Sequence, residues 1–185
     1  MTSGFRSVRG GVAINLNADE AAVLRSMAAL VLDIVEPPAA KDAFEELVGI
    51  GGNSEAPEDP VLARLFPDAY GDDPEAAGDF RRYTEDSLKR HKRENAEAML
   101  SALPERGGKI VLGKEDAHAW LKSLNDVRLA LGTRLGVDEE SYEAYLRGEK
   151  RFDSDDTAAL HIYDWLGGLQ ETLVHALFGV NRRGG

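Results

Sequence analysis

One long helical pattern, between Glu115 and Val137, constrains this chain more than any other feature of its sequence. At about 100° per residue, its large apolar residues fall on a single helical face: Trp120, Leu124, Val127, Leu131 and Leu135. Leu129 points to the opposite side, so the helix has apolar surface in two directions. This pattern predicts the central helix of a bundle, in contact with neighbours on more than one side.

Two short strand patterns accompany the helices. Residues 5–16 alternate in character around the Gly10–Gly11 pair, which is typical of a tight turn between strands. Residues 109–112 also follow a glycine pair, and the same order of glycine pair, strand and helix indicates that the two regions pair with each other. The predicted fold class is mainly α: a helical bundle with a small antiparallel β-sheet, its strands near 5–16 and 109–112.

Local signals mark where the other helices begin and end. Asn17, with Glu20 three residues later, has the pattern of a capping box at a helix start. A second long helix is predicted from about 74 to 103, between two prolines, and a last helix from about 154 to 178.

The length of 185 residues predicts a single domain over residues 1–180. Residues 49–58 are rich in glycine, proline and acids, which predicts a mobile loop. Residues 181–185 are predicted to be a tail.

Composition excludes several classes of function. The net charge of -11 is repelled by nucleic-acid phosphates, so non-specific DNA binding requires a segregated basic patch. The absence of cysteine excludes disulfides, thiolate nucleophiles and zinc–cysteine sites. No apolar run reaches membrane-spanning length, and the N-terminus lacks the apolar segment of a secretory signal. The sequence therefore predicts a cytoplasmic protein without membrane contact.

Candidate metal and catalytic groups are sparse. Glu171 and His175 have the i,i+4 spacing of helical metal ligands, and His161 with Asp164 is similar. Neither pair has a third ligand at motif distance, and no hydrolase motif is present. We therefore expect no metal site, no cofactor and no catalytic residue, and predict that the protein is not an enzyme.

The second long helix has an unusually polar inner face. This face is predicted to run through Phe80, Thr84, Ser87, His91, Asn95 and Ala98. His91 is expected to be a hydrogen-bonded core histidine. The alternative, a ligand-binding or enzymatic domain, requires a pocket with converging polar groups around His91 and Asn95.

Arg128 and Arg134 lie at the two edges of the central apolar stripe. Their structural interpretation is a bidentate bridge to a carboxylate, although Asp126 is too far round the helix to serve either. Their functional interpretation is contact with a partner protein. In the last helix, Gly167–Gly168 predicts the close approach of another backbone, with Gly132 of the central helix as the candidate.

The segment from Arg81 to Arg93 holds six basic residues, the one strong positive cluster in an acidic chain. Arg82, Lys89 and Arg93 follow one outer side of the predicted helix. A charge-balanced surface is the usual explanation of such a run. Direct DNA binding through these three residues is the alternative, and it requires a contiguous positive face and strong salt dependence.

Several stretches resemble one family over about residues 5 to 178. The most specific are LNDVRLALGTRLGV and DWLGGLQE, in the central and last helices, together with VRGGV and DPVLARLFPDAYGDDPEAAGDFRRYTE. They resemble the actinobacterial domain-of-unknown-function family that includes an oxidative-stress transcriptional regulator.

This resemblance implies a role in transcription. The described member of the family senses oxidants through a pair of cysteines and acts with an extracytoplasmic-function sigma factor. The present chain has no position onto which the thiol switch can be carried. The resemblance thus implies a regulatory or adaptor protein that contacts a sigma factor or RNA polymerase and reaches DNA only weakly or indirectly.

Overall fold

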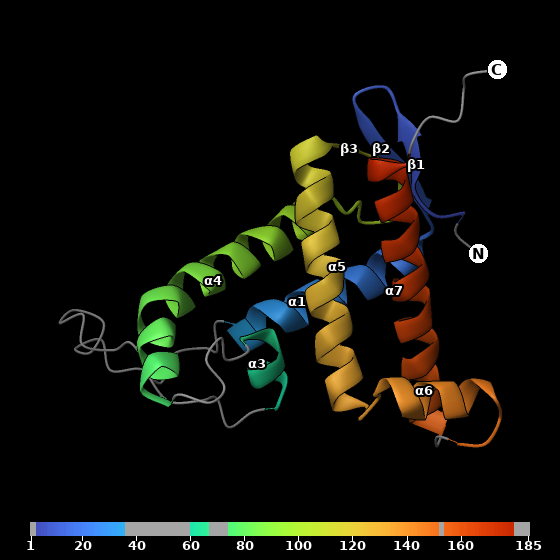
Figure 1. The fold of residues 1–185 in the computed structure, drawn as a ribbon. Helices are drawn as coiled ribbons and strands as arrows, with labels where there is room; N and C mark the ends of the chain where they lie inside the picture. Colours follow the sequence, from blue (N-terminus) through green and yellow to red (C-terminus); the bar gives the residue numbers. More distant parts are fainter. Residues whose placement is uncertain (1–2, 36–59, 67–73, 152–153, 180–185) are drawn as a thin grey trace.

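The computed structural model describes residues 3–35, 60–66, 74–151 and 154–179, while the side chains of residues 74, 76–83 and 154 are left undescribed. The predicted loop at 49–58 and the tail at 181–185 lie outside these ranges. The described part forms six helices and three strands, which confirms the mainly α class with a small antiparallel sheet (Figure 1). In chain order the elements are β1 (Arg6–Val8), β2 (Gly11–Leu16), α1 (Ala18–Val35), α3 (Pro60–Leu65), α4 (Pro74–Ala102), β3 (Gly108–Gly113), α5 (Lys114–Arg134), α6 (Glu139–Leu146) and α7 (Ser154–Phe178).

The sheet has the order β1-β2-β3, and both pairs of strands are antiparallel. The predicted turn is confirmed, since Gly10 takes a positive φ of 84° between β1 and β2. Gly11 is required for a different reason: a Cβ at this position would lie 1.9 Å from the carbonyl oxygen of Leu112. The backbones of β2 and β3 therefore come together at a point where only glycine fits.

The predicted capping box starts α1. The side-chain oxygen of Asn17 accepts a hydrogen bond from the backbone N–H of Glu20 at 2.9 Å, and the Glu20 carboxylate accepts one from the backbone N–H of Asn17 at 2.8 Å. These two bonds satisfy backbone donors that the first turn of a helix leaves free. They also fix the direction in which α1 leaves the sheet.

The central helix α5 packs against α1, α3, α4, α7 and the sheet, which confirms its predicted contacts on several sides (Figure 1). Trp120 is fully buried, and its ring meets the edge of the Phe5 ring at 5.9 Å between centroids. Leu124 and Val127 are also buried, whereas Leu131 is half-buried. None of the described helices is long and apolar enough to cross a bilayer.

The close approach at Gly11 predicts a specific loss of stability. Gly11→Ala should lower the free energy of unfolding by about 2 kcal/mol or more, because the new methyl group collides with backbone that cannot rotate away. Gly113→Ala is the matched control: it lies in the cross-strand position opposite Gly11, and its Cβ would meet nothing within 4 Å. Urea unfolding of both variants measures the difference, and equal effects would contradict the contact.

Candidate functional site

Arg128 lies across the interface between α5 and α7. Its Nη1 donates a hydrogen bond to Oε1 of Gln170 at 2.9 Å, and its guanidinium carbon lies 4.9 Å from the centroid of the Tyr163 ring. No carboxylate among the described residues forms an ion pair with it, so an amide and an aromatic ring take the place of the expected bridge. The Nε atom of Arg128 is buried without a hydrogen-bond partner in the described part of the chain.

The glycines of this interface make room for side chains. A Cβ on Gly167 would lie 3.3 Å from Nη2 of Arg128, and a Cβ on Gly132 would lie 3.1 Å from the Tyr163 ring. Gly168 has nothing within 4 Å of its Cβ position. The predicted contact of Gly167–Gly168 with the Gly132 backbone is therefore wrong, because a guanidinium and a phenol ring occupy the space that backbones were expected to share.

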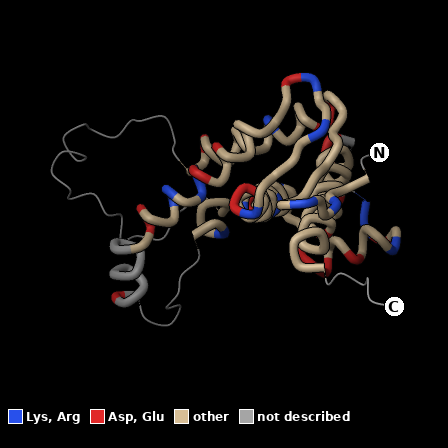
Figure 2. Tube along the Cα trace, turned by 90° about the horizontal axis from the view of Figure 1, so that it is seen from above, with Lys and Arg blue, Asp and Glu red and all other residues tan. Residues whose placement is uncertain are grey.

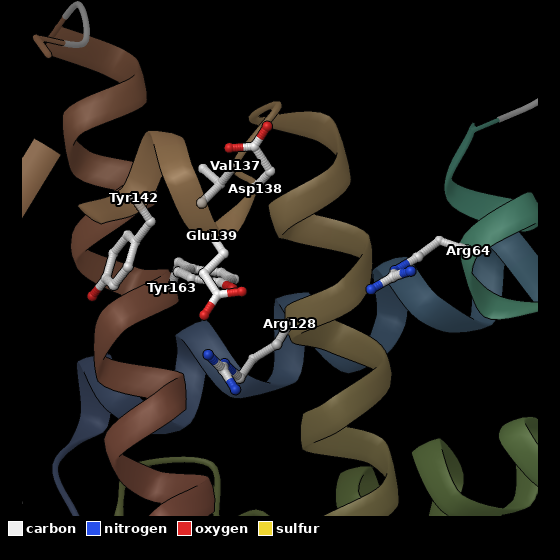
Figure 3. A pocket seen from close by; sticks show the side chains of 7 residues that line it. All are labelled: Arg64, Arg128, Val137, Asp138, Glu139, Tyr142 and Tyr163. Atoms are coloured by element: carbon white, nitrogen blue, oxygen red, sulfur yellow. The ribbon is translucent and has the colours of Figure 1, made fainter. Parts of the chain in front are cut away.

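A polar hollow opens at the end of this interface, between α3, α5, α6 and α7 (Figure 3). Its volume is about 550 Å³, and we call it the arginine–tyrosine hollow after four of its lining residues. It is lined by Arg64, Arg128, Val137, Asp138, Glu139, Tyr142 and Tyr163.

The tyrosines and arginines of the hollow come from four different helices. The Tyr142 hydroxyl donates to Oδ1 of Asp164 at 2.5 Å, and this hydrogen bond raises the pKa of Tyr142 to about 12. Tyr142 is therefore neutral over the physiological pH range, and its ring meets the edge of the Tyr163 ring at 5.8 Å. Arg64, from α3, is exposed.

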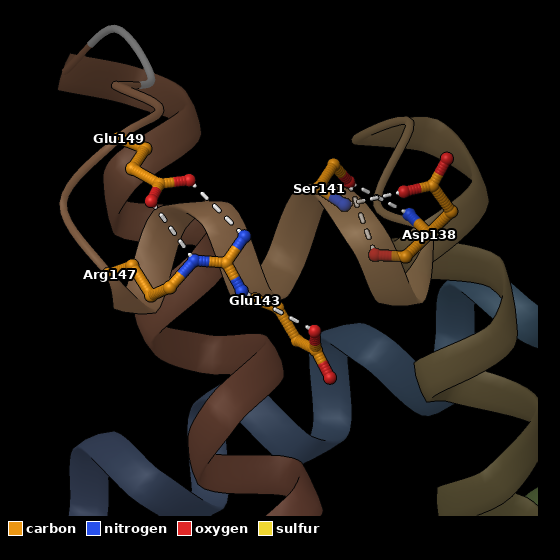
Figure 4. A network of polar contacts seen from close by, with 5 residues as sticks. All are labelled: Asp138, Ser141, Glu143, Arg147 and Glu149. Carbon is orange, nitrogen blue, oxygen red and sulfur yellow. Dashed lines mark hydrogen bonds and ion pairs between the residues drawn. The ribbon is translucent and has the colours of Figure 1, made fainter.

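Short-range bonds hold α6, which forms one wall of the hollow (Figure 4). The Asp138 carboxylate accepts a hydrogen bond from the backbone N–H of Ser141 at 2.7 Å, and this bond lowers the pKa of Asp138. Arg147 forms ion pairs with Glu143 and with Glu149 at the other end of the helix. Because α6 buries no residue, these local bonds are needed to keep it helical.

A second hollow, of about 540 Å³, lies on the other side of the interface. Its lining comes from α4, α5 and α7: Leu88, His91, Lys92, Asn95, Leu121, Lys122, Asn125, Asp126 and Gln170. Gln170 belongs to this hollow and also binds Arg128, and its Nε2 donates to Oδ1 of Asn125 at 3.5 Å. A row of contacts between α5 and α7 thus joins the two hollows, through Asn125, Gln170, Arg128 and Tyr163.

The predicted inner face of α4 is wrong at His91, which is exposed and not a core histidine. The side chain of Phe80 lies outside the description, and four other members are half-buried: Thr84, Ser87, Asn95 and Ala98. Among the described side chains of the helix, Ala96 and Met99 are the buried ones. The face was misjudged because α4 is polar along most of its length, so that its apolar residues near the C-terminal end alone decide which side packs. His91 and Asn95 do line a hollow, the feature that the ligand-binding alternative requires.

Sequence reasoning missed a buried ion pair between α4 and α5. Nζ of Lys92 lies 2.7 Å from Oδ1 of Asp126, whose exposed fraction is 3%. Burial raises the pKa of Asp126, and the hydrogen bond and charge of Lys92 offset this only in part. The sequence does contain a signal: Asp126 stands beside Val127 and three residues after Ser123, on the side of α5 that is buried.

The basic segment of α4 is charge-balanced where it is described. Lys89 pairs with Glu85 at 2.8 Å, and Arg93 lies 4.0 Å from Glu97. From Thr84 to Ala102 there are four Lys and Arg and four Asp and Glu residues, and Figure 2 shows the two colours interspersed along the helix. The side chain of Arg82 lies outside the description.

Arg134 is exposed near the C-terminal end of α5 and forms no ion pair with the described residues. It does not line either hollow, so the structure does not bring it together with Arg128. In the parts of the chain that the structure covers, no three His, Asp or Glu side chains are grouped as metal ligands.

Comparison with known proteins gives matches over most of the chain. The model of a family described as a domain of unknown function, DUF2017, matches residues 2–177. The oxidative stress regulator AosR of Mycobacterium tuberculosis is 34% identical, over 89% of this chain and 81% of its own length. The putative oxidative stress regulator AosR of Mycobacterium leprae is also 34% identical, over 85% of this chain and 78% of its own length. No solved structure matches the chain.

The buried ion pair of Lys92 and Asp126 predicts that the free energy of unfolding depends on pH in a way that Asp126→Asn abolishes. Because the pKa of Asp126 is raised above 3.8, the folded chain binds more protons than the unfolded chain between 3.8 and the folded pKa. The natural chain and Asp126→Asn therefore differ in free energy of unfolding by an amount that depends on pH. This difference, natural chain minus variant, should rise as the pH falls through the folded pKa of Asp126, and level off below 3.8.

Urea unfolding at a series of pH values measures this difference. A difference that falls on acidification would contradict the prediction, because it would mean that Lys92 holds the pKa of Asp126 below its ordinary value.

Proposed function

We propose that this chain, which belongs to the DUF2017 family, is a stress-response regulator that works by binding a partner protein at the arginine–tyrosine hollow. The names of its mycobacterial relatives support the regulatory role. We propose no catalytic activity, in keeping with relatives that are named as regulators.

The observation that carries the proposal is the position of Arg128. A guanidinium has five N–H donors, and Arg128 uses one of them for Gln170 within the described residues. It stands half-buried in a hollow that also contains Arg64 and two tyrosines. Arginine and tyrosine are enriched among the residues that dominate protein interfaces, and a planar carboxylate is the preferred acceptor for a guanidinium. Asp138 and Glu139 also line the hollow, so its two arginines are balanced by two carboxylates. A partner that inserts a hydrogen-bond acceptor, such as a carbonyl oxygen or a carboxylate, fits this site.

Other modes of action have less support. A thiol switch has no residue to act on, because the whole chain lacks cysteine. Direct DNA binding by α4 would require a positive face, whereas Lys89 and Arg93 lie beside carboxylates. With a net charge of -11, the chain is better suited to leave DNA contact to a basic partner.

The family resemblance points to the partner. A sigma factor or RNA polymerase subunit would place the action of this chain at transcription in the cytoplasm. In that complex Arg134, which is exposed on the same helix as Arg128, is a second candidate contact.

Affinity capture from the native cell, with and without oxidant, tests the proposal. The natural chain should recover a sigma factor or a polymerase subunit, and Arg64→Ala should weaken that recovery roughly fivefold or more, as loss of an interface anchor does. Arg64 is the residue to change because it is exposed, whereas substitution of Arg128 also removes its contacts with Gln170 and Tyr163.

Arg90→Ala is the matched control, an exposed arginine on α4 that does not line the hollow. Recovery of neither protein in either condition would contradict the partner assignment. Equal recovery by Arg64→Ala and Arg90→Ala would contradict the site.

A further inference from the structure

The sheet is built without carboxylates, as is the short helix α3. The chain has 33 Asp and Glu residues, yet β1, β2 and β3 contain none. In so acidic a protein, most surfaces that carry a lysine or an arginine also carry an acid close by. The sheet therefore presents a surface of different charge from the helices.

The register shows which side chains form its outer face. Arg6, Ala13 and Val111 are cross-strand neighbours in one row, and Asn15 and Lys109 form the next row on the same face. Ala13, between Arg6 and Val111, is fully buried. Val111 is 58% exposed, which is high for a large apolar side chain. The face thus combines exposed apolar area with positive charge.

The cations around this face have no carboxylate partners in the described part of the chain. Four cations form no ion pairs with the described residues: Arg6 and Lys109 on the face, Arg9 in the turn and Lys114 at the start of α5. The lysines of α4 differ, since Lys89 and Lys92 each lie within 2.8 Å of a carboxylate oxygen. Four cations that have no ion pair within the described residues, beside an exposed valine, are complementary to an acidic partner.

The edge of the sheet indicates the form of that partner. Within the described residues β3 pairs with β2 alone, so the backbone groups along its other edge have no strand partner. Such an edge accepts an added strand, in which backbone hydrogen bonds give affinity and alternate side chains give specificity. The opposite edge, β1, is only three residues long.

We propose that the free edge of β3, with the outer face beside it, binds an extended, acidic segment of a partner protein, with Lys109 facing its carboxylates. A nucleic acid fits less well, because it offers no backbone to pair with a strand edge and is repelled by the net charge of -11. The proposal does not depend on the arginine–tyrosine hollow, which lies among α3, α5, α6 and α7.

Nuclear magnetic resonance of the full chain, labelled with ¹⁵N, tests this surface with a defined probe. The probe is a peptide of about eight residues that alternates Glu and Thr, since alternate residues of a strand share a face. At about 50 mM salt it should shift the amide signals of β3, slow their hydrogen exchange and bind more tightly than the same peptide with Lys in place of Glu.

Charge reversal provides the matched comparison. Lys109→Glu should weaken binding of the acidic peptide at least about fivefold, because an attractive pair beside the added strand becomes repulsive. Lys122→Glu makes the same change of charge at an exposed site on α5 and should leave the affinity within about twofold. The unshifted signals of buried residues in both variants show that the fold is retained.

Three results would overturn the proposal. The first is the absence of any β3 shift at about 1 mM peptide, and the second is equal affinity for the Glu and Lys peptides. The third is that a single-stranded oligothymidylate shifts the same β3 amide signals at least as strongly as the acidic peptide does. That result would assign the face to nucleic acid.

Discussion

The packing of α5 against most of the other elements is the constraint on which the rest of the structure depends. Trp120 lies completely inside the core, against Phe5 from the start of the chain. Since α1, α3, α4, α7 and the sheet all pack on α5, some of its polar residues face protein, while Lys122 and Arg134 face water. Asp126 therefore needs Lys92, and Arg128 needs Gln170 and Tyr163.

These polar contacts make the central helix more than a structural support. A buried ion pair adds little net stability, because removing two charges from water costs about as much as their attraction returns. The pair between Lys92 and Asp126 serves to fix how α4 lies on α5. Arg128 combines two roles in the same way: its bond to Gln170 holds the interface with α7, and its side chain also lines the hollow where we propose that a partner binds.

Features set by neighbouring residues in the sequence could be predicted, and most features set by distant ones could not. The capping box at Asn17 and the turn at Gly10 follow from local chemistry, and the structure confirms them. The pairing of β2 with β3 joins distant residues; it was predicted from the repeated order of glycine pair, strand and helix, and the structure confirms it as well. On α4, His91 is exposed and Met99 is buried. Which of them is buried depends on the elements that pack against the helix, and the sequence of α4 alone does not indicate this. The role of Gly167 depends on a guanidinium from another helix, which no local pattern indicates.

The natural absence of cysteine allows the proposed contact at the hollow to be tested directly. Glu139→Cys places a single thiol in the hollow, and Glu94→Cys places one at an exposed position on α4. Each variant carries a photoactivated cross-linker on that thiol, and cross-linking to RNA polymerase holoenzyme is measured in cells under oxidative stress. The account predicts a cross-link to a sigma factor or polymerase subunit from position 139 and little from position 94. Equal yields from both positions, or none from position 139, would contradict it.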